Sequence, residues 1–326
     1  MKKTFLYFCL LFIVQTAFAA DSIYVREQQI PILIDRIDNV LYEMRIPAQK
    51  GDVLNEITIQ IGDNVDLSDI QAIRLFYSGV EAPSRKGEHF SVTYISSHIP
   101  GNTRKALESY SVRQDEVTAP LSRTVKLTSK QPMLKGINYF WISIQMKPET
   151  SLLAKVATTI PNAQINNKPI DITWKGKVDE RHVGIGVRQA GDDGSAAFRI
   201  PGLVTTNNGT LLGVYDIRYN SSVDLQEKID IGVSRSTDKG QTWEPMRVAM
   251  TFKQTDGLPH GQNGVGDPSI LVDEKTNTIW VVAAWTHGMG NERAWWNSMP
   301  GMTPDETAQL MLVKSEDDGK TWSEPI

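Results

Sequence analysis

The sequence predicts an all-β protein in which an N-terminal antiparallel β-sandwich is followed by the first blades of a β-propeller. From about residue 30 onward, short segments that alternate apolar and polar residues recur, separated by clusters of Gly, Asn, Asp and Pro. One eight-residue pattern also occurs twice in the second half of the chain. Short alternating strands with frequent turns are typical of sandwiches, and a repeated turn pattern indicates blades. No segment has the period of a long amphipathic helix.

The composition is that of an ordinary globular chain with room for two domains. Of its 326 residues, 40% are hydrophobic and 22% are charged, and the formal net charge is −4. Each domain can therefore bury a core. The charge balance gives no basic footprint for nucleic acid, so no nucleic-acid partner is expected. The five histidines lack metal-ligand spacing and no glycine-rich loop has the context of a phosphate site, so neither a metal nor a cofactor is expected.

The first twenty residues are expected to be a secretory signal peptide. Lys2 and Lys3 precede a mostly apolar run from Thr4 to Val14, and Ala17-Phe18-Ala19 is a small-x-small cleavage pattern. The apolar run is too short to span a bilayer. The single cysteine, Cys9, leaves with this segment, so the mature chain has no disulfide and no cysteine nucleophile. We expect an exported protein that is periplasmic, surface-bound or secreted and has no integral membrane segment.

The sandwich domain is predicted to occupy residues 21–180. Its candidate strands are Ile32–Ile37, Val40–Ile46, Glu56–Ile61, Ile70–Tyr77, Phe90–Ile95, Ser122–Thr128, Ile137–Met146, Leu152–Thr159 and Ile170–Trp174. The stretch from Lys175 to Ala196 is charged and rich in Gly, which favours a linker. The partial propeller is then predicted over residues 181–326.

The repeated pattern lies at residues 236–243 and 315–322. Both segments read S-x-D-x-G-x-T-W. In a hairpin turn of this kind the Asp accepts backbone N–H groups, the Gly supplies a positive φ, and the Trp packs back on the next strand. Agreement at all five defined positions argues against two unrelated turns and indicates repeated blades.

Two arginines are predicted to meet at one end of the first blade. Asn207-Asn208-Gly209 is a strong hairpin signal between strands at residues 199–206 and 210–217. The hairpin places Arg199 and Arg218 at its open end, within reach across the strands. Two converging guanidinium groups suit the bidentate capture of a carboxylate, and a surface ion pair is the alternative.

Further candidate residues fall at the same end because the strands that follow alternate in direction. They are Asp224 in the loop after Arg218, Asp267 at the start of a later strand, and the Trp295-Trp296 loop. Both repeats fall at the opposite end. Loops gathered at one end of a rigid scaffold are the usual layout of a site. The alternatives are a solvated loop carboxylate for Asp224, a turn residue for Asp267, and local core for the tryptophans.

The repeats are Asp-boxes, and together with Phe198-Arg199-Ile200-Pro201 they make the chain resemble the bacterial sialidase family. The resemblance is strong over residues 181–326, and weaker for the sandwich, which resembles the lectin-like domain of some members. It implies a six-bladed propeller with the Asp-boxes opposite the active site. It also implies an exo-α-sialidase that removes terminal sialic acid from glycoproteins and glycolipids with retention.

The resemblance also implies roles for individual residues. Arg199 matches the first of three arginines that bind the sialic acid carboxylate, and Arg218 matches an additional arginine on the hydroxyl or glycerol side of the sugar. Asp224 matches the general acid/base, whose pKa should be raised when substrate buries it. Asp267 matches the residue that binds the N-acyl nitrogen. Independently of the resemblance, Trp295 and Trp296 are weaker candidates for the pocket wall, because aromatic faces suit the CH faces of a sugar, and Gln309 is a weaker candidate for a polar contact.

The family's tyrosine nucleophile, its paired glutamate and the remaining two arginines match no residue here. We therefore expect an N-terminal fragment of about two blades that is inactive alone. A non-catalytic glycan-binding propeller or lectin is one alternative, and an intramolecular trans-sialidase is another. The combination of Arg199, Arg218 and Asp224 favours an enzyme over a binding propeller. Linkage preference, oligomeric state and the ligand of the sandwich stay open.

Overall fold

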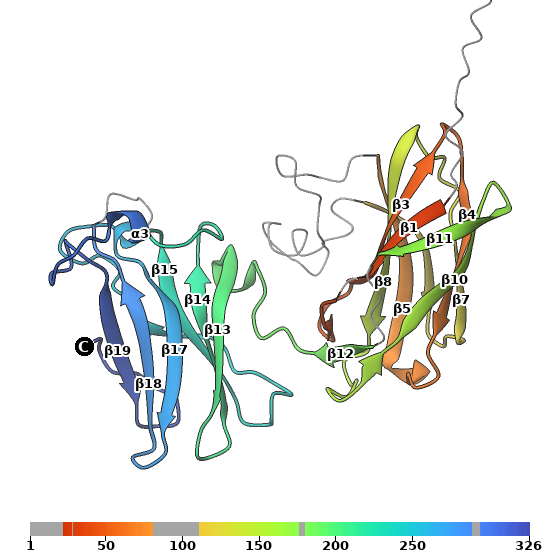
Figure 1. Cartoon of the computed structure of the whole chain (residues 1–326). Helices are drawn as coiled ribbons and strands as arrows, with labels where there is room; N and C mark the ends of the chain where they lie inside the picture. Colours follow the sequence, from red (N-terminus) through yellow and green to blue (C-terminus); the bar gives the residue numbers. More distant parts are fainter. Residues whose placement is uncertain (1–21, 28, 81–110, 176–179, 289–293) are drawn as a thin grey trace, which may run out of the picture.

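The all-β prediction is confirmed by a computed structural model that describes residues 22–27, 29–80, 111–175, 180–288 and 294–326. Figure 1 shows two groups of strands, one from each half of the chain. Among the described residues there is one α-helix, α3, which has four residues, Ala294–Asn297. None of the described helices is long and apolar enough to cross a membrane.

The N-terminal strands form one nine-stranded sheet of order β6-β5-β8-β3-β1-β11-β10-β4-β7. The bounds are β1 Ser22–Glu27, β3 Asn39–Ala48, β4 Leu54–Ile61, β5 Ile70–Gly79, β6 Val112–Thr118, β7 Thr124–Thr128, β8 Gly136–Met146, β10 Thr158–Ile165 and β11 Lys168–Lys175. Parallel pairing of β1 with β11 joins the two halves of the sheet. Residues of both halves, such as Met44, Ile73 and Ile142 from one and Ile57 and Leu127 from the other, share one buried core. The predicted sandwich is therefore a single sheet folded over on itself.

The two outer strands of this sheet are also tied to each other. The Asp115 carboxylate on β6 accepts hydrogen bonds from the backbone N–H of Thr128 on β7 (2.7 Å) and from its hydroxyl (3.0 Å). The first of these bonds satisfies a backbone N–H that an open sheet edge would leave to water. The folded sheet consequently approaches a closed, barrel-like form.

Two of the predicted strands are wrong in extent, and one lies outside the described residues. Only β2, Ile32–Leu33, forms within Ile32–Ile37, because the Asn39 side chain bonds the N–H (2.8 Å) and carbonyl (2.9 Å) of Leu33 and closes a turn. Within Leu152–Thr159 only β9, Lys155–Val156, forms before β10 begins. The segment Phe90–Ile95 belongs to the residues that the structure does not describe.

The strand β12, Arg181–Gly184, belongs by its pairing to the N-terminal half. It pairs with β2 in parallel and with β9 in the antiparallel sense. The Arg181 side chain is 3% exposed, forms an ion pair with Glu27 (3.3 Å), and donates to the carbonyls of Val40 (3.0 Å) and Leu41 (2.7 Å). The boundary at residue 180 stays a prediction, and these contacts tie the start of the predicted linker to the sandwich.

We expect residues 21–180 to fold alone as a β-domain, and a fragment that ends at residue 190 to be more stable. The shorter fragment lacks the buried guanidinium of Arg181, and loss of one partner of a buried ion pair costs about 3 kcal/mol or more. Urea unfolding followed by circular dichroism measures the difference. Arg181→Met in the longer fragment should reproduce most of the loss. A disordered spectrum from residues 21–180 would contradict the domain assignment, and equal midpoints would contradict the role of Arg181.

The C-terminal strands form two antiparallel sheets in which sequence neighbours pair, as in propeller blades. The first contains β13 Ala197–Thr205, β14 Leu211–Arg218, β15 Ile229–Ser236 and β16 Arg247–Met250, and the second contains β17 Val265–Asp273, β18 Thr278–Trp285 and β19 Gln309–Ser315. Apolar residues of both sheets, among them Val214, Ile231, Val281 and Val313, form one buried cluster. The two blades therefore pack face to face.

The two Asp-boxes have the same hydrogen bonds. In the first, Asp238 accepts from the N–H (2.9 Å) and hydroxyl (2.6 Å) of Thr242, and in the second Asp317 accepts from Thr321 at the same two distances. Gly240 has a φ of 86°. The Thr242 bonds lower the pKa of Asp238 to about 2. The turn chemistry predicted for the Asp and the Gly is confirmed, and an irregular segment, residues 243–246, precedes β16.

The second Asp-box also contacts the first blade, through an interblade cluster formed by Thr206, Thr210, Arg235 and Asp318. The Asp318 carboxylate accepts from Thr206 and Thr210 (both 2.6 Å) and from Arg235 (2.9 Å). The Arg235 Nε atom bonds the Asp318 carbonyl (2.7 Å). The equivalent position of the first box holds Lys239, which is exposed. One side chain of the second box thus fixes its position against the neighbouring blade.

Candidate functional site

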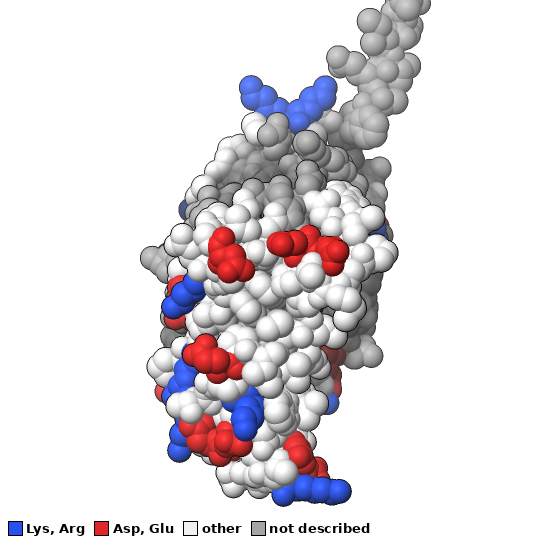
Figure 2. Space-filling view, turned by 90° about the vertical axis from the view of Figure 1, so that its left-hand side faces the viewer, with Lys and Arg blue, Asp and Glu red and all other residues white. Residues whose placement is uncertain are grey.

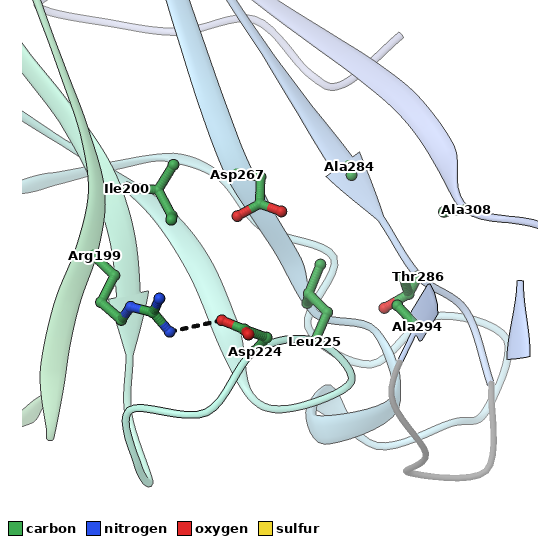
Figure 3. A pocket seen from close by; sticks show the side chains of 9 residues that line it. All are labelled: Arg199, Ile200, Asp224, Leu225, Asp267, Ala284, Thr286, Ala294 and Ala308. Carbon is green, nitrogen blue, oxygen red and sulfur yellow. Dashed lines mark hydrogen bonds and ion pairs between the residues drawn. The ribbon is translucent and has the colours of Figure 1, made fainter. Parts of the chain in front are cut away.

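A pocket of about 340 Å³ is lined by residues of both blades (Figure 3). Its lining consists of Arg199, Ile200, Asp224, Leu225, Asp267, Ala284, Thr286, Ala294 and Ala308. Three of these residues, Arg199, Asp224 and Asp267, are candidates from the sequence. On the face of the molecule that Figure 2 shows, acidic and basic side chains are interspersed and form no extended patch of one sign.

Strand register puts the arginines at one end of the first blade and the Asp-box at the other. Arg218 pairs with Ala197, and Arg199 pairs with Asp216. At the other end of β14, Leu211 pairs with Ser236, where the Asp-box begins. The predicted separation of the two ends is confirmed for this blade.

Arg199 and Arg218 converge on a single carboxylate oxygen. The Nη1 atoms of Arg199 and Arg218 lie 2.7 Å and 2.6 Å from Oδ1 of Asp224, and each also donates to the Ser222 carbonyl at 3.0 Å. Figure 3 shows Arg199 and Asp224 pointing toward each other. The predicted convergence of the two arginines is confirmed, but both contact one oxygen of Asp224 rather than the two oxygens of a bidentate pair.

The pKa of Asp224 lies below its usual range, opposite to the direction expected for a general acid. The hydrogen bond from Arg218 is the main cause, and Arg199 acts in the same direction. Burial of this partly exposed side chain raises the pKa but does not outweigh the two arginines. A raised pKa of Asp224 therefore requires a change from this arrangement: further burial by substrate, the weakening of an arginine contact, or the arrival of a second negative charge.

Asp216 lies directly behind these residues and was not predicted. It is fully buried, and its Oδ2 accepts from Nε (3.0 Å) and Nη2 (2.7 Å) of Arg218, whose side chain is 1% exposed. Burial raises the pKa of Asp216 to about 6 despite these bonds. The available signal was its place two residues before Arg218, since alternate residues of a strand share a face.

Both blades contain the same β-bulge at the pocket. In β13 the register shifts between Arg199 and Gly202, and in β17 it shifts between Gly266 and Ser269. The extra residue has a positive φ in each case, 53° for Ile200 and 55° for Asp267, and each of these residues precedes a proline. Bulges of this kind redirect side chains next to sites.

The loop that carries Asp224 is fixed by the second blade. The Leu225 carbonyl accepts from the N–H of Ala294 (3.0 Å), and the side chains of Gln226 and Thr286 bond each other. Gly264 packs so closely that an added Cβ would lie 2.2 Å from the Glu227 carbonyl oxygen. The position of Asp224 consequently depends on both blades.

The remaining candidates are less tightly tied to the pocket. Trp296, on α3, is 67% exposed and does not line it. The side chain of Trp295 lies outside the described part of the structure. Gln309 bonds the Thr307 carbonyl (2.9 Å) and follows Ala308, which does line the pocket. Their proposed roles stay predictions.

The chain contains a folded β-sandwich and two Asp-box blades, with an arginine–carboxylate pocket at the end opposite the boxes. These features define the class of Asp-box propellers that carry a β-sandwich domain. Family models agree with this class. Residues 20–169 match the N-terminal domain of BNR-repeat neuraminidase, and residues 200–326 match a BNR repeat-like domain. The chain belongs to the BNR-repeat neuraminidase, or sialidase, family.

Individual relatives extend the match over the chain. It is 57% identical to a sialidase of Bacteroides fragilis, over 100% of this chain and 61% of the relative. A sialidase of Paraclostridium sordellii is 36% identical over 40% of this chain and 29% of that protein. The solved structure of a Hadza microbial sialidase superposes with a TM-score of 0.80 and 60% identity, over 93% of this chain and 59% of that one. The chain thus spans about three fifths of the length of the Bacteroides fragilis sialidase and of the Hadza microbial sialidase.

Proposed function

We propose that the protein containing this chain is an exo-α-sialidase that hydrolyses terminal sialic acids from glycoproteins and glycolipids with retention. The observation that carries the proposal is the convergence of Arg199 and Arg218 on one carboxylate oxygen in a pocket between two blades. The relatives named sialidase support the same reaction.

Arg199 is the guanidinium available to a ligand. Its side chain is 42% exposed, whereas that of Arg218 is 1% exposed and bonded to Asp216. A sialic acid carboxylate can compete with Asp224 for Arg199, because both present the same planar pair of oxygens to the guanidinium. In this proposal Arg199 binds the sugar carboxylate and Arg218 stays behind Asp224.

Substrate binding then gives Asp224 the property of a general acid. A ligand carboxylate on Arg199 weakens one of the bonds that hold Asp224 ionised and places a second negative charge beside it. Both changes raise the pKa of Asp224. The protonated carboxyl can then donate to the leaving glycosidic oxygen, and the carboxylate that remains can activate water.

Asp267 is proposed to bind the N-acyl nitrogen of the sugar, and its place in the pocket lining supports that role. Trp295, Trp296 and Gln309 are proposed to act at the rim. Export by the N-terminal signal would bring the enzyme to glycans outside the cytoplasm.

The test is to express the complete protein and incubate it with α2,3- and α2,6-linked sialyllactose, following products by proton NMR. The proposal predicts free sialic acid that appears first as the α-anomer. An internally cyclised, anhydro product would instead identify an intramolecular trans-sialidase. Binding of sialyllactose without any product would identify a glycan-binding propeller.

A further inference from the structure

We propose that Asp216 is a positioning residue that holds Arg218 and Asp267 in the arrangement the reaction needs. The inference rests on the proposed sialidase function and assigns to that site a residue that does not line the pocket. Asp216 is buried on β14, and strand register places it opposite Arg199.

Each carboxylate oxygen of Asp216 serves a different blade. Oδ2 accepts from Nε and Nη2 of Arg218 on its own strand, at 3.0 Å and 2.7 Å. Oδ1 accepts from the backbone N–H of Asp267 on β17, at 2.9 Å. The carboxylate therefore joins an arginine of the first blade to the bulge of the second.

The bond to Asp267 fixes an unusual backbone. A φ of 55° is uncommon for a residue other than glycine and persists only where surrounding contacts hold it. The preceding residue is Gly266, and a Cβ there would lie 3.4 Å and 3.5 Å from the two Asp216 oxygens. The strand thus approaches Asp216 closely, and the contact directs Asp267 toward the pocket.

The bonds to Arg218 fix the direction of a guanidinium. With Nε and Nη2 held by Asp216, the remaining Nη1 lies 2.6 Å from Asp224. The charge of Asp216 also offsets that of the buried Arg218. If Asp216 lost its charge, Arg218 would interact more strongly with Asp224 and lower its pKa further.

Asparagine tests this role because it preserves shape but has one acceptor oxygen. In Asp216→Asn, the amide NH₂ must face either the Arg218 donors or the Asp267 N–H, so either the two Arg218 bonds or the Asp267 bond is lost. The matched control is Asp318→Asn, which weakens a hydrogen-bonded aspartate in the interblade cluster, away from the pocket. Both variants should reduce thermal stability.

The experiment measures kcat, KM and the pH dependence of kcat for the complete protein with sialyllactose. For Asp216→Asn we expect kcat to fall at least about tenfold, since displacement of site groups by an ångström can cost about a hundredfold. The basic limb of the kcat profile should move to lower pH. In an Asp224→Asn background the same change should have little further effect on kcat, because the Arg218 bonds influence proton donation through Asp224, whereas the loss of the Asp267 bond should still raise KM.

Asp318→Asn should keep kcat and the pH profile of the native protein. If Asp216→Asn also loses stability but keeps both, its role is structural and the inference is overturned. Calorimetric binding of sialic acid separates this from failure of the proposed function. If the native protein binds sialic acid without turnover, the sialidase proposal fails. In that case the positioning role predicts that Asp216→Asn binds sialic acid at least fivefold more weakly than the native protein. Equal affinities would overturn the positioning role as well.

Discussion

Replacing Asp224 with alanine should lower the kcat of the complete protein on sialyllactose by about two to four orders of magnitude, the usual contribution of a general acid/base. The affinity for sialic acid should be retained or rise. Asp224 is bonded to Arg199 at 2.7 Å and competes with the ligand for that guanidinium, so its removal frees the binding group. Steady-state kinetics and calorimetry measure the two effects separately.

The leaving group provides an internal control for this prediction. An aryl sialoside with an acidic phenol needs little protonation to depart, so Asp224→Ala should lose much less of the glycosylation rate with that substrate. Asp224→Asn should behave similarly to the alanine variant, because an amide cannot supply the proton. Unchanged turnover of sialyllactose would remove Asp224 from the catalytic assignment.

Replacing Asp318 with alanine should destabilise the two blades by about 1–3 kcal/mol, because three donors lose a common buried acceptor while Arg235 keeps its ion pair with Glu244. The Arg235 side chain is 5% exposed and that of Asp318 is 15% exposed, so water compensates little for the lost contact. Thr206 and Thr210 lose an acceptor as well. Chemical unfolding of the complete protein, followed by tryptophan fluorescence, measures the effect.

Lys239→Ala is the matched control, because Lys239 holds the equivalent position of the first Asp-box with a similar φ, 61° against 65° for Asp318. It should leave stability nearly unchanged. Equal unfolding midpoints for the two variants would show that the interblade cluster contributes nothing.

The same cluster should make stability depend on pH. Burial alone would raise the pKa of Asp318, but the bonds from Thr206, Thr210 and Arg235 outweigh it and lower that pKa below its ordinary value. An acid with a lowered folded-state pKa contributes stability above its unfolded pKa and loses that contribution as the pH falls through the folded pKa. Stability should therefore fall below about pH 4 in the native protein and less steeply in Asp318→Ala.

Much of the C-terminal fold could be predicted from local pattern. The Asp-box residues determine their own turn, and the alternation of strands between turns places Arg199, Arg218 and Asp224 at the other end. These inferences need only sequence neighbours and strand parity. They succeed because consecutive blade strands pair with each other.

Features that depend on contacts distant in sequence could not be predicted. The parallel pairing of β1 with β11 joins the two ends of the sandwich sequence, and nothing local in either strand indicates it. The lowered pKa of Asp224 depends on which donors reach its carboxylate. The role of general acid predicts a raised pKa instead. Asp216 was not predicted because a single aspartate within a strand belongs to no recognisable motif.

The twin bulges bear on how repeated units diverge after duplication. The bulge in β13 carries Arg199 and Ile200 where the bulge in β17 carries Gly266 and Asp267, and the cross-strand partners are Asp216 and Ala284. The same backbone thus offers the pocket a guanidinium from one copy and a carboxylate from the next. A descendant could change the chemistry of a blade by single substitutions at these two positions without any new loop, so the substrate range can evolve while the architecture stays constant.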